Sequence, residues 1–148
     1  MAYLLNEVKG KGAIVSCKAH KELQRGAFLE IESFESPTAY KVKDITADTK
    51  RGNFLVNIAE PKMYDETKGE DEFTVAKDEY FRARYPEPHC VHIYDKNLVE
   101  TGVAAGDYLK LGAGILAKDT AGGTADSVAI VEAVLTWQGQ ESVQVRYL

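Results

Sequence analysis

The stretch SVAIVEAVLTWQGQESVQVRYL, residues 127–148, decides the fold class of this 148-residue chain. Apolar side chains alternate with other residues along both of its halves, and β-branched residues are frequent. A period of two residues is typical of a half-buried strand, whereas a helix would show a period of about 3.6. Gly139 separates the halves, as in a tight hairpin. We therefore expect two long antiparallel strands.

Strict alternation also assigns one apolar face to each of these strands. In the first strand this face is predicted to hold Ala129, Val131, Ala133, Leu135 and Trp137. In the second strand it is predicted to hold Val143, Val145 and Tyr147.

A second pattern occurs three times, as RGAFLEI at 25–31, RGNFLVN at 51–57 and AGDYLKL at 105–111. Each copy has a glycine, a free position, an aromatic residue and a leucine. We interpret it as a turn, in which glycine permits a positive φ or a close approach, followed by the start of a strand. The copies lie at uneven intervals, which excludes a solenoid repeat.

The middle of the chain has a different character. Residues 61–72, PKMYDETKGEDE, predict a solvated acidic loop. The sequence after it allows a short helix near 76–84, which Pro86 and Pro88 would end. We expect residues 61–97 to be an insertion or a long crossover between two β-rich halves.

The N-terminal segment AIVSCKAH, residues 13–20, predicts another strand, with Val15 and Cys17 on its buried side. Residues 1–12 are expected either to be an arm that binds a partner or to form the first strand of the same sheet. Together these patterns predict one all-β domain over 1–148, a β-sandwich or small β-barrel built from two β-rich halves.

Composition narrows the function classes. The hydrophobic fraction of 45% and the charged fraction of 28% are ordinary for a globular protein. A net charge of −5 argues against nucleic-acid binding, although YFRARY at 80–85 interleaves basic and aromatic residues. No run approaches the roughly 20 apolar residues of a membrane span, and the N-terminus lacks a signal-peptide pattern. We expect a soluble protein with no nucleic-acid or membrane partner.

Cysteine and histidine raise a metal hypothesis. Cys17 and His20, and His89, Cys90 and His92, are of the residue types that zinc prefers. In a strand, however, Cys17 and His20 point to opposite faces, which leaves Cys90 and His92 as a pair of ligands. A small metal-dependent module or enzyme around Cys90 and His92 is therefore one alternative. Free buried cysteines and surface histidines explain the same residues without a metal.

Catalytic motifs do not occur in the sequence. It has no G-x-S-x-G elbow and no phosphate-binding glycine-lysine loop, and the acidic run at 65–72 does not follow the order of an EF-hand. The sequence thus predicts a protein that is not an enzyme, with no catalytic residue, no cofactor and no metal.

The segment VAAGDYLKLGAGILAKDTAGGTADSVAIVEAVLTWQGQESVQVRYL, residues 103–148, resembles the C-terminal part of the head decoration, or cement, proteins of tailed bacteriophages. The shared features are an AGD-hydrophobic-x-Leu turn and strand, a small-residue loop, and a terminal alternating strand that ends in Val and Arg. The resemblance implies a β-rich structural protein of the virion. Such a protein is made in the host cytoplasm, binds the outside of the assembled capsid, and bridges and stabilises major capsid protein subunits.

The resemblance covers about a third of the chain, and it leaves open whether the protein forms a trimer, a dimer or neither. For capsid binding, the N-terminal arm offers apolar anchors and cations that suit acidic capsid loops: Tyr3, Leu4, Leu5, Val8, Lys9 and Lys11. A second alternative is a tail or head-fibre component that binds host-surface carbohydrate through Tyr80, Phe81 and Tyr85.

Overall fold

The fold of the chain is almost entirely β in the computed structural model, which describes residues 4–9, 12–59 and 74–148. Among residues 4–9 it describes the side chains of Leu4, Glu7 and Val8. The helical segments of these ranges are two 3-10 turns, η1 (Arg51–Asn53) and η2 (Lys96–Leu98). The all-β class predicted from the sequence is confirmed.

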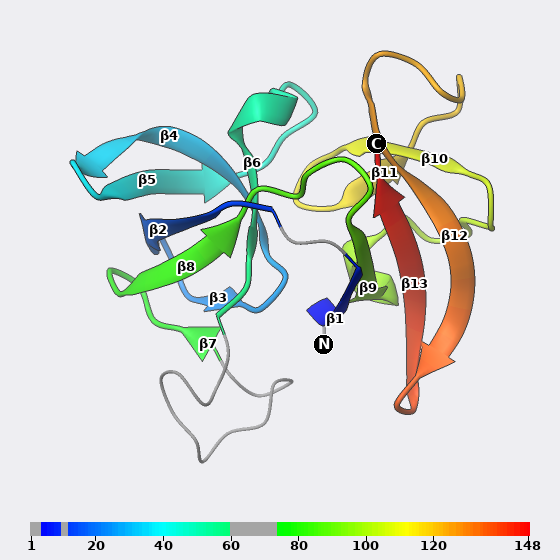
Figure 1. Ribbon diagram of the computed structural model, residues 1–148, viewed down its shortest axis with the longest axis horizontal. Helices are drawn as coiled ribbons and strands as arrows, with labels where there is room; N and C mark the ends of the chain where they lie inside the picture. Colours follow the sequence, from blue (N-terminus) through cyan, green and yellow to red (C-terminus); the bar gives the residue numbers. More distant parts are fainter. Residues whose placement is uncertain (1–3, 10–11, 60–73) are drawn as a thin grey trace.

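Five strands close into a barrel, which occupies the left of Figure 1. Around the barrel they follow the order β2 (Ile14–Lys18), β5 (Ala39–Asp44), β4 (Phe28–Ser36), β6 (Phe54–Asn57) and β8 (Tyr80–Arg84). Neighbours are antiparallel except at the β2–β5 seam, which is parallel. A separate two-stranded ribbon pairs β3 (Leu23–Gln24) with β7 (Thr74–Val75).

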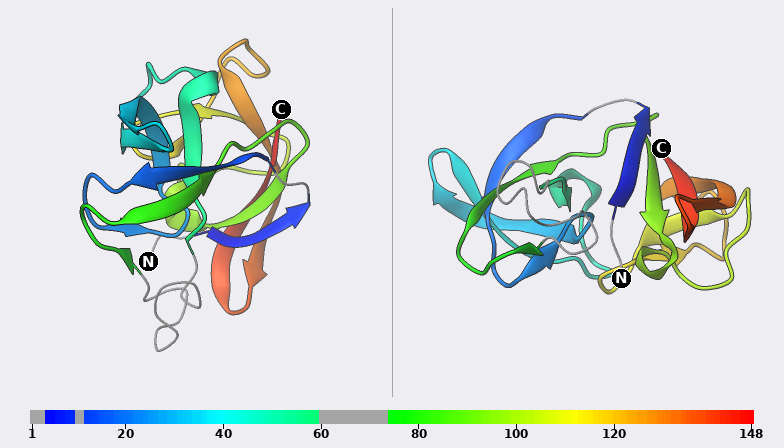
Figure 2. Two further views of the ribbon diagram at one scale, coloured as in Figure 1. Left: turned by 60° about the vertical axis from the view of Figure 1, so that its left-hand side comes forward. Right: turned by 90° about the horizontal axis from the view of Figure 1, so that it is seen from below.

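A six-stranded antiparallel sheet occupies the right of Figure 1. Its order is β1 (Leu4–Lys9), β9 (Val91–Asp95), β13 (Gln140–Tyr147), β12 (Ser127–Trp137), β10 (Tyr108–Leu111) and β11 (Leu116–Lys118). The first strand of the chain therefore belongs to the sheet, although β2 begins the barrel. The right-hand view in Figure 2 shows β1, in dark blue, between the barrel and the sheet.

The core consists of two hydrophobic clusters, and the barrel and the sheet share the second of them. Inside the barrel lies a first cluster, which includes Leu29, Leu55 and Phe81. Between the barrel and the sheet lies a second cluster, which contains Phe28 from β4 and Phe54 from β6 together with most buried side chains of the sheet. Successive residues of a strand point to opposite faces, so β4 and β6 each serve both clusters. This double burial explains why FLVN, the whole of β6, is apolar or buried.

The middle segment differs from the prediction. The short helix that the sequence allowed near 76–84 does not form, because β8 completes the barrel there, and the chain then passes from the barrel to β9 inside the six-stranded sheet. Exposed and buried residues alternate along Tyr80–Ala83, which is the period of a strand. The acidic run at 61–72 lies outside the described residues.

The glycine pattern is confirmed at two of its three copies. Gly26 and Gly106 have φ angles of 95° and 93°, and each precedes a strand by two residues. Gly52 lies instead within η1 and is not among the residues with positive φ. The second copy therefore does not use the conformational freedom of its glycine.

The predicted face of β12 is continuous as far as Val131, and beyond it the predicted residues are still more buried than their neighbours but lie on the other side of the strand. Val131 is paired with Val145, but the next pair is Ala133 with Gln144, which leaves Glu132 as an extra residue. Such a β-bulge reverses the side on which later residues point. Val134, opposite Val143, therefore points to the same side as the core, but it is 59% exposed, whereas Ala133, Leu135 and Trp137 on the other side of β12 are half-buried.

Candidate functional site

Two places bring functional groups together from distant parts of the chain, and the first is the junction between barrel and sheet. The junction is closed by β1. Leu4 N donates to Arg25 O at 2.9 Å, and Arg25 Nη1 donates back to Leu4 O at 2.9 Å. Leu4 itself has no exposed surface, and Gly26 lies directly against it. β1, the edge strand of the sheet, is thus bonded both to β9 and to Arg25 on the barrel side; the barrel and the sheet are called the two lobes below.

A carboxylate lies at the centre of the junction between two guanidinium groups. Glu7 Oε2 is 2.6 Å from Arg84 Nε, and Glu7 Oε1 is 4.0 Å from Arg25 Nη2. Arg84 Nη1 also donates to Gly12 O at 2.6 Å. The side chains of both arginines are less than a tenth exposed. A buried cation needs a counter-charge, and the Glu7 carboxylate supplies one to the guanidinium groups that packing of the sheet shields from solvent.

A histidine and two tyrosines extend this cluster into the sheet. His92 Nδ1 lies 2.7 Å from Tyr94 Oη, which lies 2.6 Å from Tyr147 Oη. Burial, with smaller contributions from Arg84 and Arg25, lowers the pKa of His92 to about 4. The imidazole is therefore neutral at pH 7, and its 3.7 Å approach to Glu7 Oε2 is not an ion pair.

These groups resemble a proton relay in their chemistry, but they are closed to solvent. His92, Tyr94 and Tyr147 have no exposed surface. Burial raises the pKa of both tyrosines, which keeps the phenols protonated at neutral pH. In this conformation a substrate does not reach these groups, so we interpret them as a buried polar network that holds the barrel and the sheet together. This network is called the junction cluster below and consists of Glu7, Arg25, Arg84, His92, Tyr94 and Tyr147.

The predicted metal ligands do not converge. Cys17 lies in the barrel cluster and Cys90 in the second cluster, and both are free thiols. Burial raises the pKa of Cys17 to about 12. His20 contacts Asp44 Oδ1 at 3.1 Å on the surface. Over residues 4–9, 12–59 and 74–148, no group of three or more His, Cys, Asp or Glu side chains is arranged to hold a metal ion.

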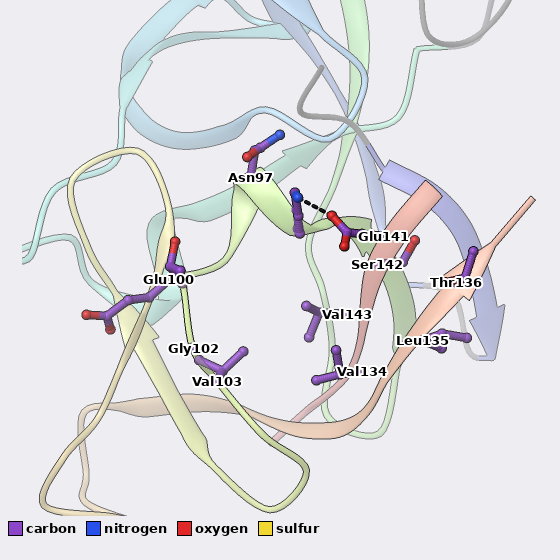
Figure 3. A pocket seen from close by; sticks show the side chains of 12 residues that line it. Asn97, Glu100, Gly102, Val103, Val134, Leu135, Thr136, Glu141, Ser142 and Val143 are labelled. Atoms are coloured by element: carbon purple, nitrogen blue, oxygen red, sulfur yellow. Dashed lines mark hydrogen bonds and ion pairs between the residues drawn. The ribbon is translucent and has the colours of Figure 1, made fainter. Parts of the chain in front are cut away.

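The second place is a groove beside the β12–β13 hairpin, shown in Figure 3. Its volume is about 670 Å³. The side chains of Val103, Val134 and Val143 form its apolar floor, and Leu135, whose side chain is on the opposite face of β12 from Val134, lies at its edge. Polar residues of η2, the following loop and the hairpin form its rim: Lys96, Asn97, Glu100, Thr101, Thr136, Glu141 and Ser142.

The groove exists because the hairpin extends beyond the rest of the sheet, as Figure 1 shows at the lower right. Val143 is 3% exposed and belongs to the core, whereas its cross-strand partner Val134 is 59% exposed. Both point to the same side. The floor of the groove is therefore a continuation of the core that the protein itself leaves uncovered.

Charges on the rim come from both sides of the groove. Lys96 Nζ pairs with Glu141 Oε2, as the dashed line in Figure 3 marks. Glu100 Oε2 accepts a hydrogen bond from Lys118 N at 2.5 Å. Asp95, which is 3% exposed, accepts a hydrogen bond from Asn97 N and so caps η2.

The predicted capsid-binding residues are distributed between β1 and segments that the structure does not describe. Leu4 is buried in the junction, and it contributes to internal packing rather than to the surface. Val8 is 47% exposed. Leu5 and Lys9 lie in β1, but their side chains are not among those that the structure describes. Tyr3 and Lys11 lie outside the described residues. Formation of the first strand, the second of the two expectations, is observed for residues 4–9.

The predicted carbohydrate platform is not a single surface. Tyr80 is 53% exposed on the outside of β8, whereas Phe81 is 2% exposed inside the barrel. Tyr85 is partly buried against the barrel cluster. Adjacent strand residues point to opposite faces, which separates Tyr80 from Phe81.

Sequence reasoning did not identify Glu7, Arg25 and Arg84, nor the groove. The arginines look solvent-exposed in the sequence, and they are buried because another lobe covers them. One signal in the sequence could have indicated the groove. Val134 and Leu135 are adjacent and both apolar, which breaks the alternation near the end of β12.

In comparisons with known proteins, no protein-family model matches the chain and no curated protein matches it significantly. No helix in the described ranges is long and apolar enough to cross a membrane.

Proposed function

We propose that this chain is a structural protein of a tailed-bacteriophage particle, which binds the outside of the assembled capsid and bridges neighbouring major capsid protein subunits. The observation that carries the proposal is the groove of Figure 3. Val103, Val134 and Val143, from its floor, all fall in the segment 103–148 that resembles decoration proteins. The resemblance and the uncovered apolar surface therefore coincide in the same segment of the chain.

The rest of the molecule supports an adhesive role. The polar side chains of the junction cluster are buried and bonded to one another, and they connect the two lobes. On the six-stranded sheet, exposed large apolar side chains lie instead at Val8 and Val134. An exposed apolar surface on a rigid β scaffold suits protein-protein contact.

Stabilisation of a capsid follows from such a contact. Each bound copy would bury surface across a boundary between two capsid subunits, and this interface must separate before the boundary opens. Because the protein binds the closed state of the boundary preferentially, binding shifts the equilibrium toward that state.

Co-sedimentation with undecorated capsids tests the proposal. The wild-type protein is expected to sediment with capsids and to raise the temperature at which they open. The variant Val134→Glu places a charge in the groove floor and is expected to lose most of this binding. Ile14→Glu is the matched control, because Ile14 is 49% exposed on β2 of the barrel.

Two results would contradict the proposal: absence of wild-type protein from the capsid pellet, or equal retention of Val134→Glu and Ile14→Glu. Circular dichroism of both variants establishes that they are folded. A stoichiometric metal that survives dialysis of the purified protein would instead favour the alternative centred on Cys90 and His92.

A further inference from the structure

The open edge of β12 defines what kind of group the groove can receive. Trp137 and Gln140 flank a two-residue turn, so they form a hydrogen-bonded pair of the hairpin. Hydrogen-bonded and non-hydrogen-bonded pairs alternate in an antiparallel ladder. The main-chain N–H and C=O groups of Val134 and Thr136 therefore point away from β13.

The edge of β12 that faces away from β13 is paired with other main chain as far as Val131 and is unpaired by described strands after it. β10 pairs with β12 from Ser127 to Ile130, and the ladder ends where Val131 exchanges hydrogen bonds with Gly106 and Asp107. Beyond Val131, no described strand pairs with the outer edge of β12. Within residues 4–9, 12–59 and 74–148, the main-chain N–H and C=O groups of Val134 and Thr136 beside the groove thus have no hydrogen-bond partner, and an extended polypeptide would satisfy them.

The rim adds an electrostatic preference. Glu100 and Glu141 line the groove against the single cation Lys96, whose pKa is raised mainly by Glu141 and to a smaller extent by Asp95. Glu141 uses one oxygen for Lys96, and Glu100 uses one for Lys118 N. Among the described residues, the second oxygen of each carboxylate accepts no hydrogen bond. The side chain of Lys118 does not supply a second cation to Glu100, because its Nζ pairs with Asp107 Oδ2 at 3.5 Å.

We infer that the groove receives an extended segment of a capsid subunit, which adds as a strand to the open edge of β12, places an apolar side chain against Val134 and Val103, and pairs a flanking Lys or Arg with Glu100 or Glu141. This inference rests on the proposed function for the identity of the partner. Its chemistry follows from the free strand edge, the uncovered core face and the excess of carboxylates on the rim.

A charge-reversal experiment tests the electrostatic part. The double variant Glu100→Lys/Glu141→Lys is expected to bind capsids at least about tenfold more weakly than wild type at low salt, with a smaller difference at high salt. Glu32→Lys, an exposed position on β4 of the barrel, is the control and is expected to bind as wild type does. Equal binding of the double variant and the control at low salt would overturn the inference.

A peptide experiment tests the same chemistry without capsids. Two short synthetic peptides share a Val-Thr-Leu centre and differ only in flanking lysines or glutamates. Titration is followed by the methyl NMR signals of Val103, Val134 and Val143 and by the amide signals of Val134 and Thr136. The lysine peptide is expected to shift these signals at lower concentration than the glutamate peptide does. Equal effects of the two peptides, or shifts confined to the barrel, would contradict the inference.

The two experiments separate this inference from the proposed function. If wild-type protein does not bind capsids but the lysine peptide occupies the groove, the capsid role fails and the groove chemistry stands. If capsid binding survives the double charge reversal and neither peptide is preferred, the groove chemistry fails and the capsid role stands.

Discussion

The junction cluster and the hairpin groove are built from the same materials, a few charged side chains beside an apolar surface, and they differ in access to solvent. In the junction, Glu7 and Arg84 are covered by both lobes, and His92 is completely buried. In the groove, Glu141 and Lys96 are more than half exposed and Val134 is uncovered. The comparison teaches that unusual ionisation does not by itself mark the functional surface of this molecule. Its strongest pKa shifts occur where partners cannot reach.

This difference in access predicts a difference in energy. A buried ion pair leaves an uncompensated charge when one partner is removed, whereas an exposed pair is replaced by water. Variants of the junction should therefore change the free energy of unfolding, and variants of the groove should change binding. The predictions below run from the largest expected effect on stability to the smallest.

The largest effect is expected for Glu7→Gln. The substitution retains the shape of the side chain but leaves the Arg84 guanidinium buried without its counter-charge at 2.6 Å. We expect a loss of about 3–5 kcal/mol in the free energy of unfolding, measured by urea denaturation. Glu132→Gln, which breaks the exposed pair with Arg146, is the control and should cost less than about 1 kcal/mol. Similar losses in both variants would show that the junction is not sealed.

The next effect is a dependence of stability on pH through His92. Its pKa is about 4 in the folded protein, against an ordinary value of 6.5. Between these values the unfolded chain takes up a proton that the folded protein does not, so stability falls as the pH decreases from 6.5 to 4. The pKa difference corresponds to about 3 kcal/mol. This loss is complete near pH 4 and absent above pH 7.

His92→Gln isolates this contribution, because glutamine does not titrate. Urea denaturation of both proteins at pH 7, 5.5 and 4 should show a steeper loss for wild type, while carboxylate titration affects both alike. Parallel curves would mean that the His92 imidazole accepts a proton within the folded junction.

A smaller, graded effect is expected at the glycines of the repeated pattern. In Gly26→Ala, the new Cβ would lie 2.3 Å from Leu4 N at a φ of 95°, so β1 must move and the backbone is strained. Gly106→Ala has a similar φ of 93° but open space, and should cost about 1–2 kcal/mol. Gly52→Ala meets nothing and has no positive φ, so it should be neutral within about 0.5 kcal/mol.

Thermal unfolding of the three variants tests this order. Gly26→Ala should lose more stability than Gly106→Ala, because only Gly26 touches the strand that closes the junction. If Gly106→Ala were the more damaging, close approach of β1 would not be the reason for glycine at position 26.

The sequence was sufficient to predict strands but not how they are shared between lobes. Alternation identified β2 and the β12–β13 hairpin, because each has one face that is buried and one that is not. It did not identify β8 as part of a barrel or β1 as an edge of the distant sheet, since these pairings join residues far apart in the chain.

The candidate site was hidden from the sequence for a related reason. Arg84 occupies the polar side of β8, and only the docking of the sheet makes this side internal. Val134 occupies a predicted outward position, and one bulge at Glu132 returns it to the core face. Burial of the first and exposure of the second depend on long-range packing, which a period of two residues does not encode.

The smallest effect on stability is expected for Val134→Glu, and it is the sharpest test of the contrast between junction and groove. Val134 and Val143 are cross-strand partners on one face, but Val134 is 59% exposed and Val143 is 3% exposed. Val134→Glu should therefore change the free energy of unfolding by no more than about 0.5 kcal/mol, whereas Val143→Ala should cost at least about 1 kcal/mol. Urea denaturation at pH 7 measures both. If Val134→Glu were as destabilising as Val143→Ala, the groove floor would be core in the free protein, and no uncovered surface would remain for a partner to complete. If it is neutral while capsid binding is lost, the same side chain that contributes nothing to folding contributes to attachment.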